Sequence, residues 1–252
     1  MSESQLLVIT IALLAAALML LAYRRLRAGD AFVLRPLPGY RALRQQLGLA
    51  IEGGRRPHLT LGRGPLHTVS GPSSVAALKI LDELGASGAK STLSPRVTVG
   101  TGTLLPAAED TLRRVYEEAG RDGAFPPSSV EFIADDSFPF SYAAGVSAML
   151  DEAENGSLMA AGRFGEEIII INEAAQRAGL EQVTATDDPL AMALATAGSG
   201  EALWGEELFA AGAYLEEAPL QVASVRAQDM LRWLLAAIIV IIALLQLLLS
   251  LV

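Results

Sequence analysis

Two uncharged apolar runs at the ends of the chain constrain its fold more than any other feature. Residues 6–23 form a run of 18 residues in which only Thr10 and the terminal Tyr23 are polar. Residues 234–252 form a second run, interrupted only by Gln246 and Ser250. At 1.5 Å per residue, 18 helical residues span about 27 Å, close to the thickness of a bilayer core. We therefore predict two transmembrane helices.

The predicted helices cover residues 5–23 and 231–252, and arginines flank both on the side that faces the middle of the chain. These are Arg24, Arg25 and Arg27 after the first helix, and Arg226 and Arg232 before the apolar run of the second. Positive residues stay in the cytoplasm. The flanks therefore predict a two-pass protein of the cell membrane, with a cytoplasmic middle and both termini outside. A cleaved signal peptide fits poorly, because the leader Met1–Ser4 has no positive charge.

Composition excludes several kinds of chemistry. The chain of 252 residues is 52% hydrophobic and 19% charged, which is too apolar for a disordered protein. It has no cysteine, so disulfides, thiol nucleophiles, zinc–thiolate sites and iron–sulfur clusters are ruled out. With only two histidines, His58 and His67, a centre with several histidine ligands is not expected. The sequence does not identify a cofactor.

Charge is segregated along the chain. Residues 24–56 carry eight arginines and two acids, whereas residues 100–225 carry 22 acids and five arginines. The basic segment contains a short helix pattern, with Leu43, Leu47 and Ile51 on one face, and this helix is expected to lie at the membrane or to pack on the domain. An acidic body lacks the basic footprint of a nucleic-acid-binding protein, so the predicted partners exclude nucleic acid and include the lipid bilayer.

Between residues 57 and 226, short apolar runs alternate with segments of helical period. The predicted strands cover 58–61, 96–99, 130–134, 157–161, 182–185 and 202–204. The predicted helices cover 73–84, 104–119, 141–153, 166–178, 189–196 and 206–215. This alternation is typical of βαβ units and a parallel sheet. We predict an α/β fold, a Rossmann-like three-layer domain, without assigning a strand order.

Ligands of open parallel sheets bind beyond the carboxyl ends of the strands, and Gly, Arg and acidic residues are grouped there. Arg63 and Arg163 are candidates to meet an anion, and Gly100 and Gly102 precede a predicted helix start. The pattern lacks the third glycine of the dinucleotide fingerprint, and no P-loop sequence is present. Ordinary turn geometry explains the same glycines.

Acids at the same strand ends offer oxygen ligands for Mg²⁺ or Ca²⁺. They are Asp135, Asp136, Glu166, Asp187, Asp188, Glu206 and Glu207. The alternative is that they cap helix amino termini. His67 and Ser70 lie close in sequence but lack a nucleophile-elbow motif, so no catalytic set is predicted.

Several segments resemble an uncharacterised family of prokaryotic membrane proteins of unknown function. They are residues 38–54, FPFSYAAGV at 138–146, Gly162 with Glu166 and the following IIII, WGEELFAAGAYL at 204–215, and Gln228-Asp229. The resemblance implies two terminal transmembrane helices around a cytosolic domain, and no chemistry. It draws attention to Tyr142, Glu166, Glu206 and Glu207 as a shared cluster.

These observations favour a non-catalytic, self-assembling scaffold or interaction protein, and we expect a homo-oligomer. One alternative is a sensor that binds a small molecule or nucleotide at the strand carboxyl ends. The other is a metal-dependent hydrolase that uses the acids. The candidate ligand-binding residues are Arg63, Gly100, Gly102, Asp135, Tyr142, Arg163, Glu166, Glu206 and Glu207.

Overall fold

The computed structural model describes residues 3–29, 32–91, 93–121, 125–152, 154–198 and 200–250. The chain divides into two compact units. One, Leu37–Ala211, holds the sheet. The other combines Met1–Pro36 with Gly212–Val252.

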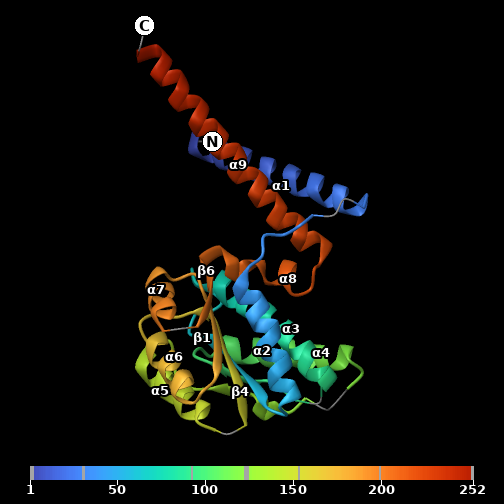
Figure 1. Ribbon diagram of the computed structural model, residues 1–252, viewed down its shortest axis with the longest axis vertical. Helices are drawn as coiled ribbons and strands as arrows, with labels where there is room; N and C mark the ends of the chain where they lie inside the picture. Colours follow the sequence, from blue (N-terminus) through green and yellow to red (C-terminus); the bar gives the residue numbers. More distant parts are fainter. Residues whose placement is uncertain are drawn as a thin grey trace. The chain divides into compact units, whose positions relative to one another are not determined.

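The sheet unit alternates helices and strands, as the sequence predicts (Figure 1). The strands are β1 (Arg56–Gly62), β2 (Arg96–Val99), β3 (Val130–Phe132), β4 (Asn155–Arg163), β5 (Glu181–Thr186) and β6 (Glu201–Trp204). The helices are α2 (Pro38–Glu52), α3 (Gly71–Ser91), α4 (Leu104–Glu118), α5 (Pro139–Leu150), α6 (Ile168–Arg177) and α7 (Pro189–Ala197), with 3-10 turns η1 (Pro127–Ser129) and η2 (Gly205–Ala210).

All six strands pair in parallel, in the order β3-β2-β1-β4-β5-β6. This is the Rossmann order, which reverses direction between β1 and β4. Helices α2, α3 and α4 lie on one face of the sheet and α5, α6 and α7 on the other (Figure 1). The predicted α/β fold with three layers is confirmed.

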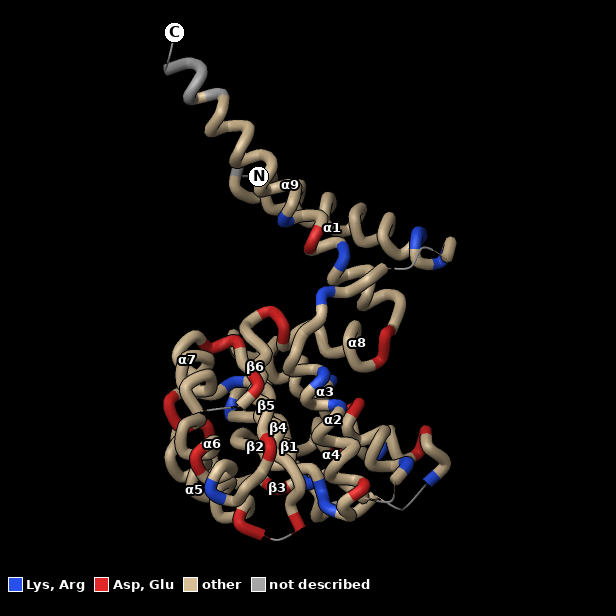
Figure 2. The backbone as a smooth tube through the Cα atoms, viewed as in Figure 1, with Lys and Arg blue, Asp and Glu red and all other residues tan. Residues whose placement is uncertain are grey.

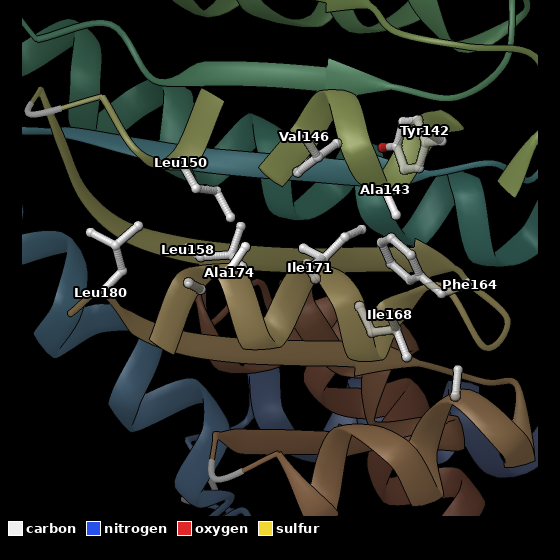
Figure 3. Packing of buried hydrophobic residues seen from close by; sticks show 13 residues of the cluster. Tyr142, Ala143, Val146, Leu150, Leu158, Phe164, Ile168, Ile171, Ala174 and Leu180 are labelled. Carbon is white, nitrogen blue, oxygen red and sulfur yellow. The ribbon is translucent and has the colours of Figure 1, made fainter. Parts of the chain in front are cut away.

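The core between the sheet and α5–α6 is apolar and closely packed. Tyr142, Val146 and Leu150 of α5 meet Leu158 of β4 and Ile171 of α6 (Figure 3). In a strand, alternate side chains face opposite sides. His58 and Thr60 therefore face α5, whereas Leu59 and Leu61 face the other layer. These two polar side chains therefore lie beneath α5, and the Tyr142 hydroxyl forms a hydrogen bond with Thr60, as described below.

Helix α2 packs on the sheet through Tyr40, Leu43, Gln46 and Ala50, so the amphipathic segment takes the second of its two expected positions. The Tyr40 hydroxyl donates to the Glu207 carbonyl at 2.5 Å. That carbonyl lies in the predicted helix 206–215. The structure has instead the 3-10 turn η2 followed by one α-helical turn, α8 (Ala211–Tyr214), so this predicted helix is corrected.

The second unit contains α1 (Glu3–Arg27) and α9 (Pro219–Ser250), which pack against each other. Residues 4–27 and 219–244 are long and apolar enough to cross a membrane. Figure 2 shows that most of both helices carries no charged residue. Helix α9 begins twelve residues before the predicted span. Its Arg226 lies over the Phe32 ring, 5.3 Å from the ring centroid, and Tyr214 donates to the Arg35 carbonyl at 2.6 Å.

Candidate functional site

The candidate site is the edge of the sheet formed by the loops that follow the strands, here called the carboxyl edge. At its centre lie two glycines with positive φ: Gly62 (+69°), the last residue of β1, and Gly162 (+124°), the last but one of β4. A Cβ on Gly62 would lie 2.3 Å from the Arg163 carbonyl oxygen. The Arg63 amide donates to that carbonyl at 3.0 Å. The backbones at the ends of β1 and β4 are therefore in direct contact.

Arg63 connects three loops at this point. Its Nε donates to Glu167 Oε1 at 2.7 Å, and its terminal nitrogen donates to Asp136 Oδ1 at 2.8 Å and to the Asp136 carbonyl. The Glu167 side chain is 0% exposed, Arg63 is 15% exposed and Asp136 is 49% exposed. Glu167 Oε2 also accepts from the Gly165 amide at 3.0 Å. The inner pair is thus a fully hydrogen-bonded, buried ion pair.

Gly100 makes room for Arg63 and Tyr142. A Cβ at Gly100 would lie 2.5 Å from Arg63 Cγ and 3.0 Å from the Tyr142 ring, whereas one at Gly102 would meet nothing within 4 Å. The Tyr142 hydroxyl pairs with the Thr60 hydroxyl at 2.5 Å and donates to the Thr98 carbonyl at 3.3 Å. Burial raises the pKa of Tyr142 to about 12, so its hydroxyl stays neutral.

The second arginine, Arg163, has a weaker partner. It lies 3.8 Å from Asp188 Oδ2, and its side chain is half exposed. Asp188 also caps α7, accepting from the amides of Leu190 and Ala191 at 3.0 and 3.1 Å. The neighbouring Asp187 accepts from the Ser73 hydroxyl at 2.6 Å, so a carboxylate already lies at the amino terminus of α3. An anion arriving there would meet a like charge.

The acids of the carboxyl edge are spread along it. Asp135 follows β3 and accepts from Ser137, whereas Glu206 and Glu207 follow β6, and Glu207 accepts from the Trp204 amide at 3.0 Å. Strands β3 and β6 are the two outer strands, separated by about 24 Å at 4.8 Å per strand. Among the residues that the structure describes, no three acids of this edge bring their oxygens close enough for one metal ion. Several act as caps.

The structure therefore brings together three of the nine candidates, Arg63, Gly100 and Tyr142. Arg163 lies on the other side of β4, Gly102 and Glu166 are exposed, and the remaining acids lie at the outer strands. Ligand binding by these residues stays a prediction. Nor does a histidine complete a catalytic set. His67 is exposed, and burial, with Arg96 and Arg56 nearby, lowers the pKa of His58 to about 3.

Sequence reasoning missed Glu167, the buried partner of Arg63, and selected the exposed Glu166. The signal was the helical phase. Glu167 is four residues before Ile171 and seven before Ala174, both on the buried face of α6. A residue at these spacings faces the core as well.

It also missed the exposed apolar side chains of the carboxyl edge, here called the edge hydrophobics. Each belongs to a strand end, a loop or the first turns of a helix on this edge. They are Val69, Val75, Phe132, Phe138, Phe140, Ile169, Ile170, Leu190, Trp204 and Phe209. Among the described residues of the sheet unit, one other large apolar side chain is exposed, Leu49 on α2. The IIII run was a signal, because one face of a helix can bury only its first and fourth members.

The sheet is all-parallel and has the Rossmann order, and the same chain has two helices able to cross a membrane. These features define the class of the protein as an α/β protein with terminal apolar helices. The chain belongs to the family described as a domain of unknown function (DUF6754), which matches residues 1–251. The resemblance to an uncharacterised family is thus confirmed. No curated protein and no solved structure matches the chain.

Proposed function

We propose that this protein is a membrane-tethered, non-catalytic assembly module that contacts further copies of itself through the carboxyl edge. The edge hydrophobics carry this proposal, because ten of the eleven exposed large apolar side chains of the sheet unit lie on that edge. Exposed apolar groups concentrated on one face are typical of an interaction surface. Meanwhile Arg63, Glu167 and Asp136, the charged groups best placed for a ligand, are paired with one another.

The partner that we favour is a second copy, because two membrane helices hold all copies in one plane and one orientation. That confinement raises the effective concentration of each edge near its neighbours. The orientation belongs to the proposal. Arginines that follow the apolar part of α1, and those that precede the apolar part of α9, favour a cytoplasmic sheet unit.

Native mass spectrometry of the full chain, released from mild detergent, tests the assembly. We expect a defined homo-oligomer, and we expect Phe138→Ser/Phe140→Ser to shift it towards the monomer. Leu49→Ser is the matched control, because Leu49 is similarly exposed but lies away from the edge. A wild-type monomer, or an oligomer that all variants retain, would refute the proposal.

The orientation has its own test, since the chain contains no cysteine. In intact cells, Glu117→Cys on α4 should resist a membrane-impermeant maleimide and should react once the cells are opened. Labelling in intact cells would place the sheet unit outside.

A small-molecule sensor is the second candidate, and the strand order favours it. Rossmann-like sheets bind ligands where the strand order reverses, here between β1 and β4, and Arg163 is half exposed beside that point. The same mass spectrum would then show an added mass of nucleotide size, and Arg163→Ala would remove it. An added mass that survives Arg163→Ala would remove this residue from the site.

A further inference from the structure

A pocket of about 610 Å³ lies at the opposite edge of the sheet, where β5 and β6 begin. Its walls come from the second half of α2, the end of α6 and the first residues of both strands. This volume is in the range of small-molecule sites. Its polar lining consists of four glutamines and two glutamates, Gln45, Gln46, Gln176, Gln182, Glu181 and Glu201. Nothing assigned to the carboxyl edge involves these residues.

Two of the glutamines are buried with unused hydrogen-bonding groups. Gln46 is 7% exposed, and its amide has no partner among the described residues. Gln182 is 6% exposed. Its Nε2 donates to the Gly198 carbonyl at 3.1 Å, which fixes the amide orientation, because a carbonyl accepts only from the nitrogen. Gln182 Oε1 is left without a donor among the described residues. Gln182 projects from the face of the sheet that α6 covers, so its unpaired oxygen lies on the other side of the sheet from α2. The Gln46 amide faces the sheet from α2, and it therefore points to a ligand with N–H or O–H donors.

The two glutamates give the pocket its charge. Val183 of β5 pairs with Glu201 of β6, and Glu181 lies two residues before Val183. Glu181 and Glu201 therefore project from the same face of the sheet, with their Cα atoms about 8 Å apart by strand geometry. No Lys or Arg is among the described residues that line the pocket. Phosphates and carboxylates would find no counter-charge there, whereas ammonium groups would find two.

We infer that this pocket binds an aliphatic diamine or polyamine. Two ammonium groups separated by about four carbons match the spacing of the two carboxylates. Ammonium donors pair with carboxylates and supply the hydrogen that the Gln46 amide oxygen lacks. Ala42, Leu49 and Leu180, which also line the pocket, contact the hydrocarbon chain.

Titration calorimetry on the full chain in a neutral detergent, at physiological salt, tests the inference. The probes are putrescine, spermidine and 1,4-butanediol, which has the putrescine spacer with hydroxyls in place of ammonium groups. We expect putrescine and spermidine to bind saturably with one ligand per chain, and butanediol to give no saturable heat. Absence of saturable binding by both amines, or equal binding of butanediol, would overturn the inference.

Variants locate the binding. Glu181→Gln/Glu201→Gln should weaken putrescine binding by about tenfold or more, since two charge-assisted contacts are lost. Gln46→Leu keeps the volume of the side chain and should weaken it by about three- to tenfold. Glu117→Gln removes the same kind of charge from α4, which packs near β2 and β3, and should change nothing. If putrescine binds all of these variants with equal affinity, the amine binds elsewhere and the proposed site is refuted. One folded pocket variant is enough for this conclusion.

Discussion

Replacing Arg63 by methionine should destabilise the sheet unit strongly, because it leaves the Glu167 carboxylate buried without its counter-charge. Removing one partner of a buried ion pair costs about 3–5 kcal/mol. Arg63 retains 15% exposure, which favours the lower end, and the half-exposed Asp136 adds less than about 1 kcal/mol. For a domain of this size, 1 kcal/mol lowers the melting temperature by about 2–4 °C. We expect a fall of about 6–12 °C.

Tryptophan fluorescence of the full chain in mild detergent measures the transition. The chain has two tryptophans, and a Trp233→Phe background leaves Trp204 at the end of β6 as the reporter. Arg163→Met is the control, since its 3.8 Å contact with Asp188 is solvated and should contribute less than about 1 kcal/mol. Adding Glu167→Gln to Arg63→Met removes the buried charge and should restore most of the loss. Equal shifts for the two arginine variants, or no recovery in the double variant, would refute the reasoning.

Three further predictions use the same thermal assay. Above pH 6.5 His58 is neutral in both the folded and the unfolded chain, so its titration does not affect stability. As the pH falls from 6.5 towards 3, the unfolded chain binds a proton at His58 that the folded chain does not bind, so stability falls by up to about 1.4 kcal/mol per pH unit, and His58→Gln should flatten this slope. Tyr142→Phe leaves the buried Thr60 hydroxyl with one partner fewer and should cost about 1–2 kcal/mol, and an unchanged transition would contradict the hydrogen bond. Gly100→Ala should lower the free energy of unfolding by about 1–3 kcal/mol, because the added methyl group clashes with Arg63. Gly102→Ala should change it by less than about 0.5 kcal/mol, and equal effects of the two variants would contradict the packing.

Much of the fold was predictable because local signals decide it. Each predicted strand is present, since short apolar runs between helical segments have few other ways to be buried. The strand order was not predictable, because periodicity reports which face of an element is buried and not which element lies beside it. The end of the domain also differed, since η2 and α8 replace the predicted helix 206–215. This segment is packed by distant parts of the chain, such as Tyr40, which donates to a carbonyl 167 residues away.

The candidate site was predicted only in part, for the same reason. The sequence placed Arg63, Gly100 and Tyr142 at strand or helix ends, and the structure brings them together. The partners of Arg63 lie 73 and 104 residues further along the chain, so their meeting depends on the strand order. Gly100 was a candidate for an anion-binding turn, with ordinary turn geometry as the alternative, whereas its neighbours show that it accommodates two side chains.

The two outer strands of the sheet are short, and this limits how such chains can aggregate. Strand β3 has three residues and β6 has four, and each carries a glutamate, Glu131 and Glu201. Short, charged outer strands offer few free backbone groups to a neighbouring strand. If copies of the chain meet in one membrane, as we propose, a long bare edge would template β-pairing between them. The short, charged outer strands of this sheet disfavour such pairing.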